Sequence, residues 1–309
     1  MNSVMPLVSV ILATNRIGPF FPEALASVEA QSYSNVELIV VDDGAPESAE
    51  VDLAVSSITN ARVIHQAAAG VSVARNVGIA AAQGEYVAFL DDDDRWDPRR
   101  LELQVGHFLA TPHAVACYCG MRTINHEGEV LAHADQVPVA DRLDIARRST
   151  GIILPNTMVR RAALVAAGGF HAGIRLAEDL DLMLRLAERG DFLFEPQALV
   201  DYRNHGSNTT RRHRDLVESI ERVLRLHRGN AHERGDIDLV EALDESLRKN
   251  RRFAWWSAGR AAKAELQHRR PFKAAGEFRW ALMAAPTGLV DGGLRSLQRI
   301  RRRSSKQLP

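Results

Sequence analysis

Three short apolar runs, each followed directly by a polar cluster, constrain the fold of this chain more than any other feature of its sequence. The runs are Leu7–Leu12, Glu37–Val41 and Tyr86–Leu90, and the clusters are Asn15-Arg16, Asp42-Asp43-Gly44 and Asp91–Asp94. Helical spacing occurs between them. Apolar strands alternating with helices are typical of a parallel sheet covered on both faces, whose ligands bind beyond the carboxyl ends of the strands. We therefore predict an α/β domain in which the three clusters meet at one crevice.

The rest of the chain is expected to be mixed α/β to about residue 212 and helical beyond it. Further strands are predicted at Ala61–His65, Ala114–Met121, Phe192–Phe194 and Leu199–Tyr202. Helices are predicted at Pro22–Gln31, Val71–Ala82, Pro98–Thr111, Arg160–Ala167 and Asp179–Arg189. From about Asp215 the sequence is helical, with breaks near Gly229–Gly235, Arg270-Pro271 and Pro286–Gly293. We therefore divide it into a domain of residues 1–212 and a helical, basic extension of residues 213–309.

The formal net charge of zero is the sum of two opposite halves. Residues 1–210 hold 16 basic and 27 acidic side chains, a net of −11, whereas residues 211–309 hold 23 and 12, a net of +11. Residues 246–309 alone hold 16 basic and 3 acidic residues. Such asymmetry suggests an anionic partner for the C-terminal part.

The run Asp91-Asp92-Asp93-Asp94 is the strongest chemical signal. Four adjacent carboxylates repel one another, and a hard divalent cation that bridges a diphosphate would compensate their charge. The alternative is a solvated acidic turn that caps a helix starting at Pro98, with Asp97 as the cap. The place of the run after an apolar strand favours the functional interpretation.

Four other positions each have a functional and a structural interpretation. Asp43 can accept hydrogen bonds from a ribose or base, or stand in an ordinary Asp-Gly turn. Arg75, near a helix start, suits a phosphate, or is a surface arginine. Glu178-Asp179 can supply a general base, or favour a helix N-terminus electrostatically. His205 can complete a metal site, or be a structural histidine.

Taken in order, these segments resemble family 2 glycosyltransferases of the GT-A fold, across roughly residues 6–210. The matching stretches are Leu7–Arg16, Val36–Gly44, Gly70–Pro98, Gly168–Arg189 and Tyr202–His205. The resemblance implies a Rossmann-like, mostly parallel sheet flanked by helices. One departure is that Ala13-Thr14-Asn15-Arg16 is one residue shorter than the family's usual loop and lacks its tyrosine, so the base of the donor is not predicted.

The resemblance also implies roles for individual residues. Donor contacts are expected from Ala13, Thr14, Arg16, Asp43, Arg75, Asp91 and Asp92. Asp93 is expected to be the main metal ligand, with Asp91 and His205 as further ligands, although four consecutive aspartates leave the register open by one position. Asp179 falls on the family's catalytic base, with Glu178 beside it.

The implied function is an inverting, Mg²⁺- or Mn²⁺-dependent glycosyltransferase that uses a UDP-, dTDP- or GDP-sugar. Its acceptor would be a glycan or a lipid-linked glycan in cell-envelope polysaccharide or glycolipid synthesis. One alternative is a catalytically inactive sugar-nucleotide-binding or scaffold protein of the same fold. A weaker one is a nucleotidyltransferase, which would need a glycine-rich basic loop that Ala13–Gly18 does not provide.

The C-terminal part is interpreted separately. Leu294, Leu297 and Ile300 recur opposite arginines, and aromatic residues lie among basic ones at Phe253, Trp255, Trp256, Phe278 and Trp280. This pattern suits an anionic membrane surface; nucleic acid is not expected, and helices packed on the catalytic domain are the alternative.

The cellular location is predicted from the absence of membrane-span and signal patterns and from the two cysteines. No run reaches the ~18 apolar residues of a membrane span, and no secretory signal pattern is present. Cys117 and Cys119 lie too close along one expected strand to form a good disulfide, so we expect buried thiols. We therefore expect a cytoplasmic protein, peripheral on the inner face of the plasma membrane.

Overall fold

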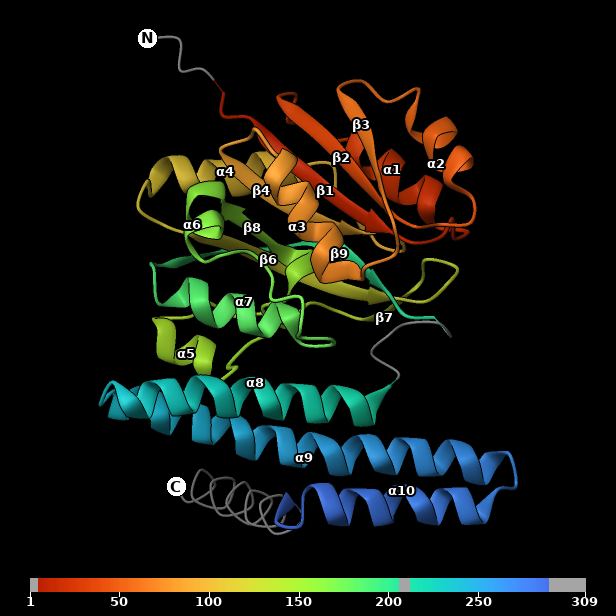
Figure 1. Cartoon of the computed structure of the whole chain (residues 1–309), viewed down its shortest axis with the longest axis vertical. Coiled ribbons are helices and arrows are strands. Elements are labelled where there is room, and N and C mark those ends of the chain that lie inside the picture. The colour runs from red at the N-terminus through yellow and green to blue at the C-terminus, as the bar shows by residue number, and fades with distance from the viewer. Residues whose placement is uncertain (1–4, 206–211, 289–309) are drawn as a thin grey trace, which may run out of the picture. The chain divides into compact units, whose positions relative to one another are not determined.

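The computed structural model describes residues 5–205 and 212–288, and the chain divides into two compact units, residues 1–208 and 209–309 (Figure 1). The first unit contains a curled sheet and the second is helical. The strands are β1 (Val8–Thr14), β2 (Val36–Asp43), β3 (Ala61–Gln66), β4 (Tyr86–Asp91), β5 (Arg95–Trp96), β6 (Ala116–Ile124), β7 (Val130–Ala132), β8 (Thr157–Arg160) and β9 (Phe192–Arg203).

The sheet is mostly parallel, as predicted. Its order is β3-β2-β1-β4-β8-β6-β9-β5, with β7 paired to β6. The first four strands in this order run parallel, so their carboxyl ends lie at one edge. Beyond them, β8 is antiparallel to both β4 and β6, and β9 is parallel to β6. The chemistry-bearing segments after β1, β2 and β4 are therefore neighbours.

Helices cover both faces of the sheet because the strands alternate their apolar side chains. The helices are α1 (Phe21–Glu29), α2 (Ser48–Val55), α3 (Val71–Ala81), α4 (Arg100–Ala110), α5 (Arg142–Ala146), α6 (Arg161–Ala166) and α7 (Glu178–Ala187), with a 3₁₀ turn at Leu154–Asn156. Val10 and Leu12 of β1 pack in the cluster that includes α1, α2 and α4. Ile11 packs in the opposite cluster, with α3, α6 and α7. Both free cysteines are buried, as expected.

Three expectations about local structure were wrong or incomplete. The two strands expected in residues 192–202 are one strand, β9, whose pairing with β6 shifts register opposite Gly120 so that Pro196 and Gln197 bulge out. A Cβ at Gly120 would lie 2.8 Å from the Gln197 carbonyl oxygen, so this bulge needs a glycine opposite it. Helix α4 begins at Arg100 rather than at Pro98. Helix α2 was not predicted from the sequence.

The second unit, in its described part, is a set of three helices: α8 (His213–Glu233), α9 (Ile237–Gln267) and α10 (Pro271–Ala284). The breaks near residues 229–235 and 270–271 are confirmed. Helix α9 packs against both α8 and α10, and the Asn250 amide donates to the Val217 carbonyl at 2.9 Å. No helix within residues 5–205 and 212–288 is long and apolar enough to cross a membrane.

The aromatic residues of this unit do not share one outward face. Phe253, Trp255 and Trp280 pack in its small core, and Trp255 Nε1 donates to the Ala285 carbonyl at 2.7 Å. Trp256 is exposed, and the Arg260 guanidinium carbon lies 3.8 Å from the centre of its ring. Of the five aromatics expected to meet a membrane, three are therefore turned inward. The expected amphipathic stretch at Leu294, Leu297 and Ile300 lies outside the described residues.

Candidate active site

The carboxyl ends of β1, β2 and β4 bring the three predicted polar clusters to one edge of the sheet. Thr14 is in register with Asp42 on one side, and Ala13 with Asp91 on the other. The Thr14 hydroxyl lies 2.6 Å from Asp92 Oδ2 and 2.6 Å from the Arg16 carbonyl oxygen. The convergence predicted from the strand pattern is confirmed at this edge.

The two aspartates at the end of β2 are both saturated by the chain itself. Asp42 Oδ1 accepts from the Ala45 amide at 2.7 Å, and its Oδ2 accepts from the Ser48 hydroxyl and lies 2.8 Å from His65 Nδ1. Burial opposes ionisation of Asp42, but these hydrogen bonds outweigh it and lower its pKa.

Asp43, the residue expected to face the base, orders the segment before α3. Its Oδ1 accepts from the Gln66 side chain at 2.6 Å and from the Ala69 amide at 2.7 Å, and its Oδ2 accepts from the Gly70 amide at 2.8 Å. Gly70 has φ +97°, which favours glycine, so the turn into α3 depends on both residues. Asp43 is therefore placed to hold the loop that lines this edge.

The four aspartates after β4 have four different environments. Asp91 is half-buried and binds Arg75, Asp92 contacts Thr14, Asp93 contacts His205, and Asp94 is fully buried. Burial and the neighbouring carboxylates raise the pKa of Asp92 to about 6, and raise those of Asp93 and Asp94 as well. Asp94 is 1% exposed, and the other three carboxylates each bind a residue outside the run, so this is not a freely solvated turn.

Arg75 joins the aspartate run to the start of α7. Its two terminal nitrogens donate to Asp91 Oδ1 and Glu178 Oε1, each at 2.8 Å, and its guanidinium lies 5.5 Å from the centre of the Phe170 ring. Burial would lower the pKa of Arg75, but the two carboxylates raise it above its ordinary value. The arginine is buried rather than on the surface, and its charge is already shared between these carboxylates.

Asp179, the expected base, lies one residue beyond this bridge. Desolvation and the adjacent Glu178 raise its pKa to about 6, while the Leu180 amide, 2.7 Å from its Oδ1, and Arg75 oppose the rise. Leu176 and Ala177, just before it, have positive φ values of 60° and 123°, which cost energy in non-glycine residues. The chain thus holds a partly buried carboxyl of raised pKa at a strained turn, beside the aspartate run.

Asp93 and His205, two of the expected metal ligands, are adjacent in space. His205 Nε2 lies 2.8 Å from Asp93 Oδ2, although 112 residues separate them in the sequence. Within the described residues, no group of three or more His, Cys, Asp or Glu side chains is arranged to hold a metal ion. Magnesium is commonly held by one or two carboxylates together with substrate phosphates, so this donor pair fits a cation that binds with a diphosphate.

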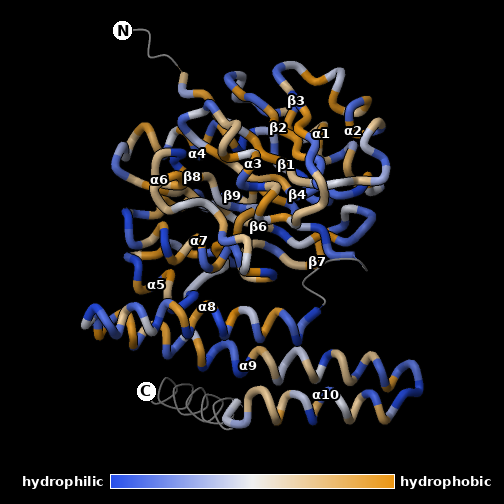
Figure 2. The backbone as a smooth tube through the Cα atoms, in the orientation of Figure 1, coloured by the Kyte–Doolittle hydropathy of each residue, from blue (hydrophilic) through white to orange (hydrophobic). Residues whose placement is uncertain are grey.

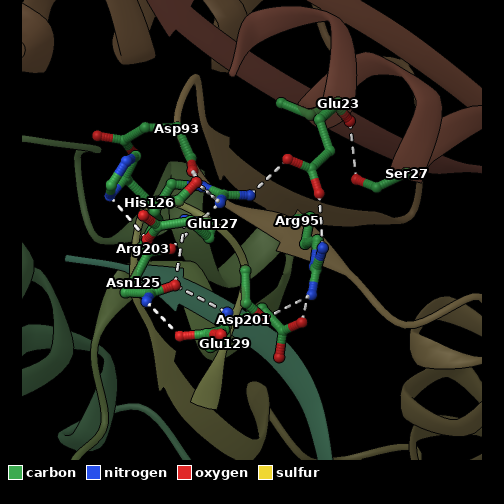
Figure 3. A network of polar contacts seen from close by, with 12 residues as sticks. Glu23, Ser27, Asp93, Arg95, Asn125, His126, Glu127, Glu129, Asp201 and Arg203 are labelled. Carbon is green, nitrogen blue, oxygen red and sulfur yellow. Dashed lines mark hydrogen bonds and ion pairs between the residues drawn. The ribbon is translucent and has the colours of Figure 1, made fainter. Parts of the chain in front are cut away.

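The sequence analysis missed Arg203, which binds Asp93 and Asp94 of the aspartate run; Figure 3 shows it with Asp93 and Glu23. Its side chain is 2% exposed, and its Nε donates to the Asp93 carbonyl oxygen at 3.0 Å, while its backbone amide donates to Asp94 Oδ1 at 2.8 Å. Its terminal nitrogens bind Glu23 of α1 and the carbonyls of Asn125 and His126. Its place in Tyr202–His205, after a strand, was the only signal that could have pointed to it.

A second arginine, Arg148, was also missed. It follows α5 with a positive φ of 52°, and its Nη1 is buried without a hydrogen-bond partner among the described residues. Burial lowers its pKa, and the charge of Asp179 opposes the change. The charge of Asp179 acts on Arg148, so this side chain lies near the expected base.

Comparison with known proteins gives concordant results. The model of the family "Glycosyl transferase family 2" matches residues 9–164. One similar protein is an uncharacterized glycosyltransferase of Rickettsia typhi, which is 26% identical to this chain over 71% of either protein. Another is WcaA of Escherichia coli, described as a colanic acid biosynthesis glycosyl transferase. It is 29% identical over 65% of this chain and 74% of the WcaA chain. Residues 1–349 of S. aureus TarS have a similar fold, with a TM-score of 0.64 at 20% identity, covering 91% of this chain and 81% of that one. A further TarS structure, in complex with UDP-GlcNAc, has a TM-score of 0.60.

Proposed function

The chain belongs to glycosyl transferase family 2 and is a glycosyltransferase of the GT-A fold, and on that premise we propose that it moves a sugar from a nucleotide-diphospho-sugar to an acceptor hydroxyl with inversion. The observation that carries this proposal is the bridge through Arg75, which ties Asp91 of the aspartate run to Glu178, the neighbour of Asp179. This bridge supports placing both halves of the proposed chemistry, leaving-group binding and proton removal, at one site.

In the proposed reaction, Asp179 takes the proton of the acceptor hydroxyl as its oxygen attacks the anomeric carbon. The bond from that carbon to the diphosphate breaks, and the nucleoside diphosphate leaves from the opposite face. A raised pKa makes Asp179 a stronger base than an ordinary carboxylate, and it is still ionised at neutral pH. Glu178 is engaged by Arg75 and by the Ala177 amide at 3.1 Å, so it supports Asp179 rather than competing with it.

The donor side is proposed to consist of Ala13, Thr14, Arg16, Asp43, Arg75, Asp91 and Asp92. The TarS complex with UDP-GlcNAc supports a nucleotide-sugar donor for this chain, and UDP, dTDP and GDP sugars are the ones to compare. Asp93, with Asp91 or His205, would hold Mg²⁺ or Mn²⁺. Such a cation, when bound, neutralises charge on the leaving diphosphate. Arg203, which donates to the Asp93 carbonyl, would hold the backbone of this proposed ligand in place.

The acceptor is proposed to be a glycan or a lipid-linked glycan with a negative group near the reacting hydroxyl. Arg148 supports this, because a buried guanidinium nitrogen without a partner gains a charge-assisted hydrogen bond from a phosphate or carboxylate. The descriptions of WcaA and of a chondroitin synthase of Pasteurella multocida support a role in polysaccharide synthesis.

We propose a cytoplasmic enzyme that works at the inner face of the plasma membrane, with residues 246–309 toward the anionic surface.

The experiment is a binding and turnover assay on one set of proteins. Thermal shift with UDP-, GDP- and dTDP-sugars, each with Mn²⁺ or with EDTA, identifies the donor and its metal requirement. Release of nucleoside diphosphate then reports hydrolysis or transfer. Asp179→Asn is expected to keep donor binding and lose turnover, while Glu50→Gln, at an exposed carboxyl of α2, keeps both. Donor binding without turnover by the wild-type chain, across acceptor panels, would instead favour the inactive sugar-nucleotide-binding protein.

A further inference from the structure

Helix α10 has an exposed apolar side. Phe272 is 92% exposed, Phe278 47%, Leu282 56% and Met283 72%. At 3.6 residues per turn these four side chains fall within an arc of about 140°. Figure 2 shows hydrophobic residues recurring along this helix. Soluble proteins seldom leave several large apolar side chains together in water, so a partner is expected for this side.

The opposite side of α10 fixes which way the apolar side faces. Ala274 and Ala281 are buried, and Glu277 lies 3.0 Å from His213 Nε2 and 2.8 Å from an Arg214 terminal nitrogen. Trp280 also packs inward, with its ring against that of His213. These contacts hold the inner side within the helical unit, so the four apolar residues are not part of its core.

Positive charge borders the apolar side. Residues 269–288 contain four basic side chains, Arg269, Arg270, Lys273 and Arg279, and one acidic side chain, Glu277. All four basic residues are exposed, whereas the Glu277 charge is already taken up by His213 and Arg214. Arg279 lies within the apolar arc itself, and Arg269 and Arg270 form the turn that leads into the helix.

We propose that this side of α10 docks on an anionic lipid bilayer, with the helix lying in the plane of the surface. Amphipathic helices bind such surfaces by inserting apolar side chains at the level of the lipid headgroups, while basic side chains around them contact the anionic headgroups. A second copy of this chain fits less well, because a two-fold contact through this side would bring the same four cations together. The proposal deepens the proposed function, since a lipid-linked acceptor lies at the same surface.

The test uses the full chain and vesicles of phosphatidylcholine, with or without about a quarter of phosphatidylglycerol, in co-sedimentation. The wild-type chain should bind the anionic vesicles and lose binding as salt is raised. The triple variant Phe272→Ser/Leu282→Ser/Met283→Ser should bind at least about tenfold more weakly. Neutralising Arg269, Arg270 and Lys273 to Gln should weaken binding by about 10- to 100-fold. Ile237→Ser, a 70% exposed position at the start of α9, is the matched control and should bind like the wild type.

Three results would overturn the proposal. They are absence of wild-type binding to anionic vesicles, binding by either triple variant that equals that of the wild type, and a wild-type dimer that the apolar triple variant converts to a monomer. Donor binding in the absence of vesicles, measured on the same proteins, should be unchanged in all of them. A variant that keeps donor binding but loses vesicle binding separates this proposal from the glycosyltransferase function, which would fail independently if no donor bound.

Discussion

Two acidic clusters lie at the same edge of one sheet, at the ends of β2 and β4, and have opposite electrostatics. At the end of β2, Asp42 and Asp43 accept six contacts from amides, side chains and an imidazole, and the pKa of Asp42 is lowered. At the end of β4, desolvation and mutual repulsion raise the pKa values of Asp92, Asp93 and Asp94. The fold therefore favours the ionised form of Asp42, whereas burial and neighbouring carboxylates disfavour the ionised forms of Asp92, Asp93 and Asp94.

This electrostatic difference between the two clusters indicates which carboxylates are functional. Carboxylates saturated by the chain hold a loop, and their ionisation is already compensated. Carboxylates buried together without enough donors store unfavourable energy, which a bound cation or a substrate proton can relieve. Asp179, with a pKa of about 6, belongs with the β4 cluster on this criterion, and Arg75 connects the two.

The largest expected effect is on catalysis. Asp179→Asn should lower the transfer rate by about 10²- to 10⁴-fold, the range typical of a lost general base. In the wild-type chain the rate should fall as the pH drops through about 6, because protonated Asp179 accepts no proton. Desolvation and then the charge of Glu178 raise the pKa of Asp179 to that value, against the Leu180 amide and Arg75. Steady-state rates from pH 5 to 8 check both points. If Asp179→Asn kept a near-normal rate and intact donor binding, Asp179 would not be the general base.

Removing Arg203 should be the most destabilising change near the β4 cluster. Arg203→Met leaves the Asp93, Asn125 and His126 carbonyls without their donor and removes one of the two arginines that bind Glu23, at a cost of about 3 kcal/mol. The matched control is Arg95→Met, because Arg95 binds the same Glu23 but is 34% exposed; its expected cost is about 1 kcal/mol. Urea unfolding measures both. Equal costs would mean that the buried network does not depend on Arg203.

Asp42→Asn should destabilise the chain by about 2 kcal/mol at pH 7. Both Asp42 oxygens accept hydrogen bonds, and an amide nitrogen would face a donor. Since the folded-state pKa is lowered, this stabilisation exists above the ordinary pKa of an aspartate and is lost as the pH falls through the folded-state value. The difference in unfolding free energy should therefore shrink in strong acid. No loss at pH 7 would contradict the structural role given to the β2 cluster.

Asp92→Asn should have the smallest effect, of the opposite sign. The amide oxygen can still accept from Thr14, and the substitution removes a carboxylate whose raised pKa destabilises the fold when ionised. A gain of about 1 kcal/mol is expected at pH 8 in EDTA and almost none below about pH 3, where Asp92 is protonated in both the folded and the unfolded chain. Thermal melting at the two pH values measures it. A loss of stability at pH 8 would contradict the proposed electrostatic difference between the two acidic clusters.

Much of this site follows from local sequence. Near-continuous apolar strands that end in polar clusters predicted neighbouring strand ends, because parallel strands in this order have no other common edge. Arg203, Arg148 and the bulge opposite Gly120 were not predictable in this way. Each depends on contacts between residues far apart in the chain, such as the 110 residues between Arg203 and the Asp93 carbonyl.

The sequence by itself determined the α/β alternation, the family and the identity of the carboxylates at the strand ends, since these follow from residue type and spacing. Only the tertiary structure decided which carboxylates are satisfied and which are not. That depends on the donors that folding brings within about 3 Å, on burial and on neighbouring carboxylates, and the pKa values of Asp42 and Asp92 differ for these reasons. In the same way, composition identified a basic, aromatic C-terminal part, but packing decided that three of its aromatics turn inward and that Phe272, Phe278, Leu282 and Met283 face out.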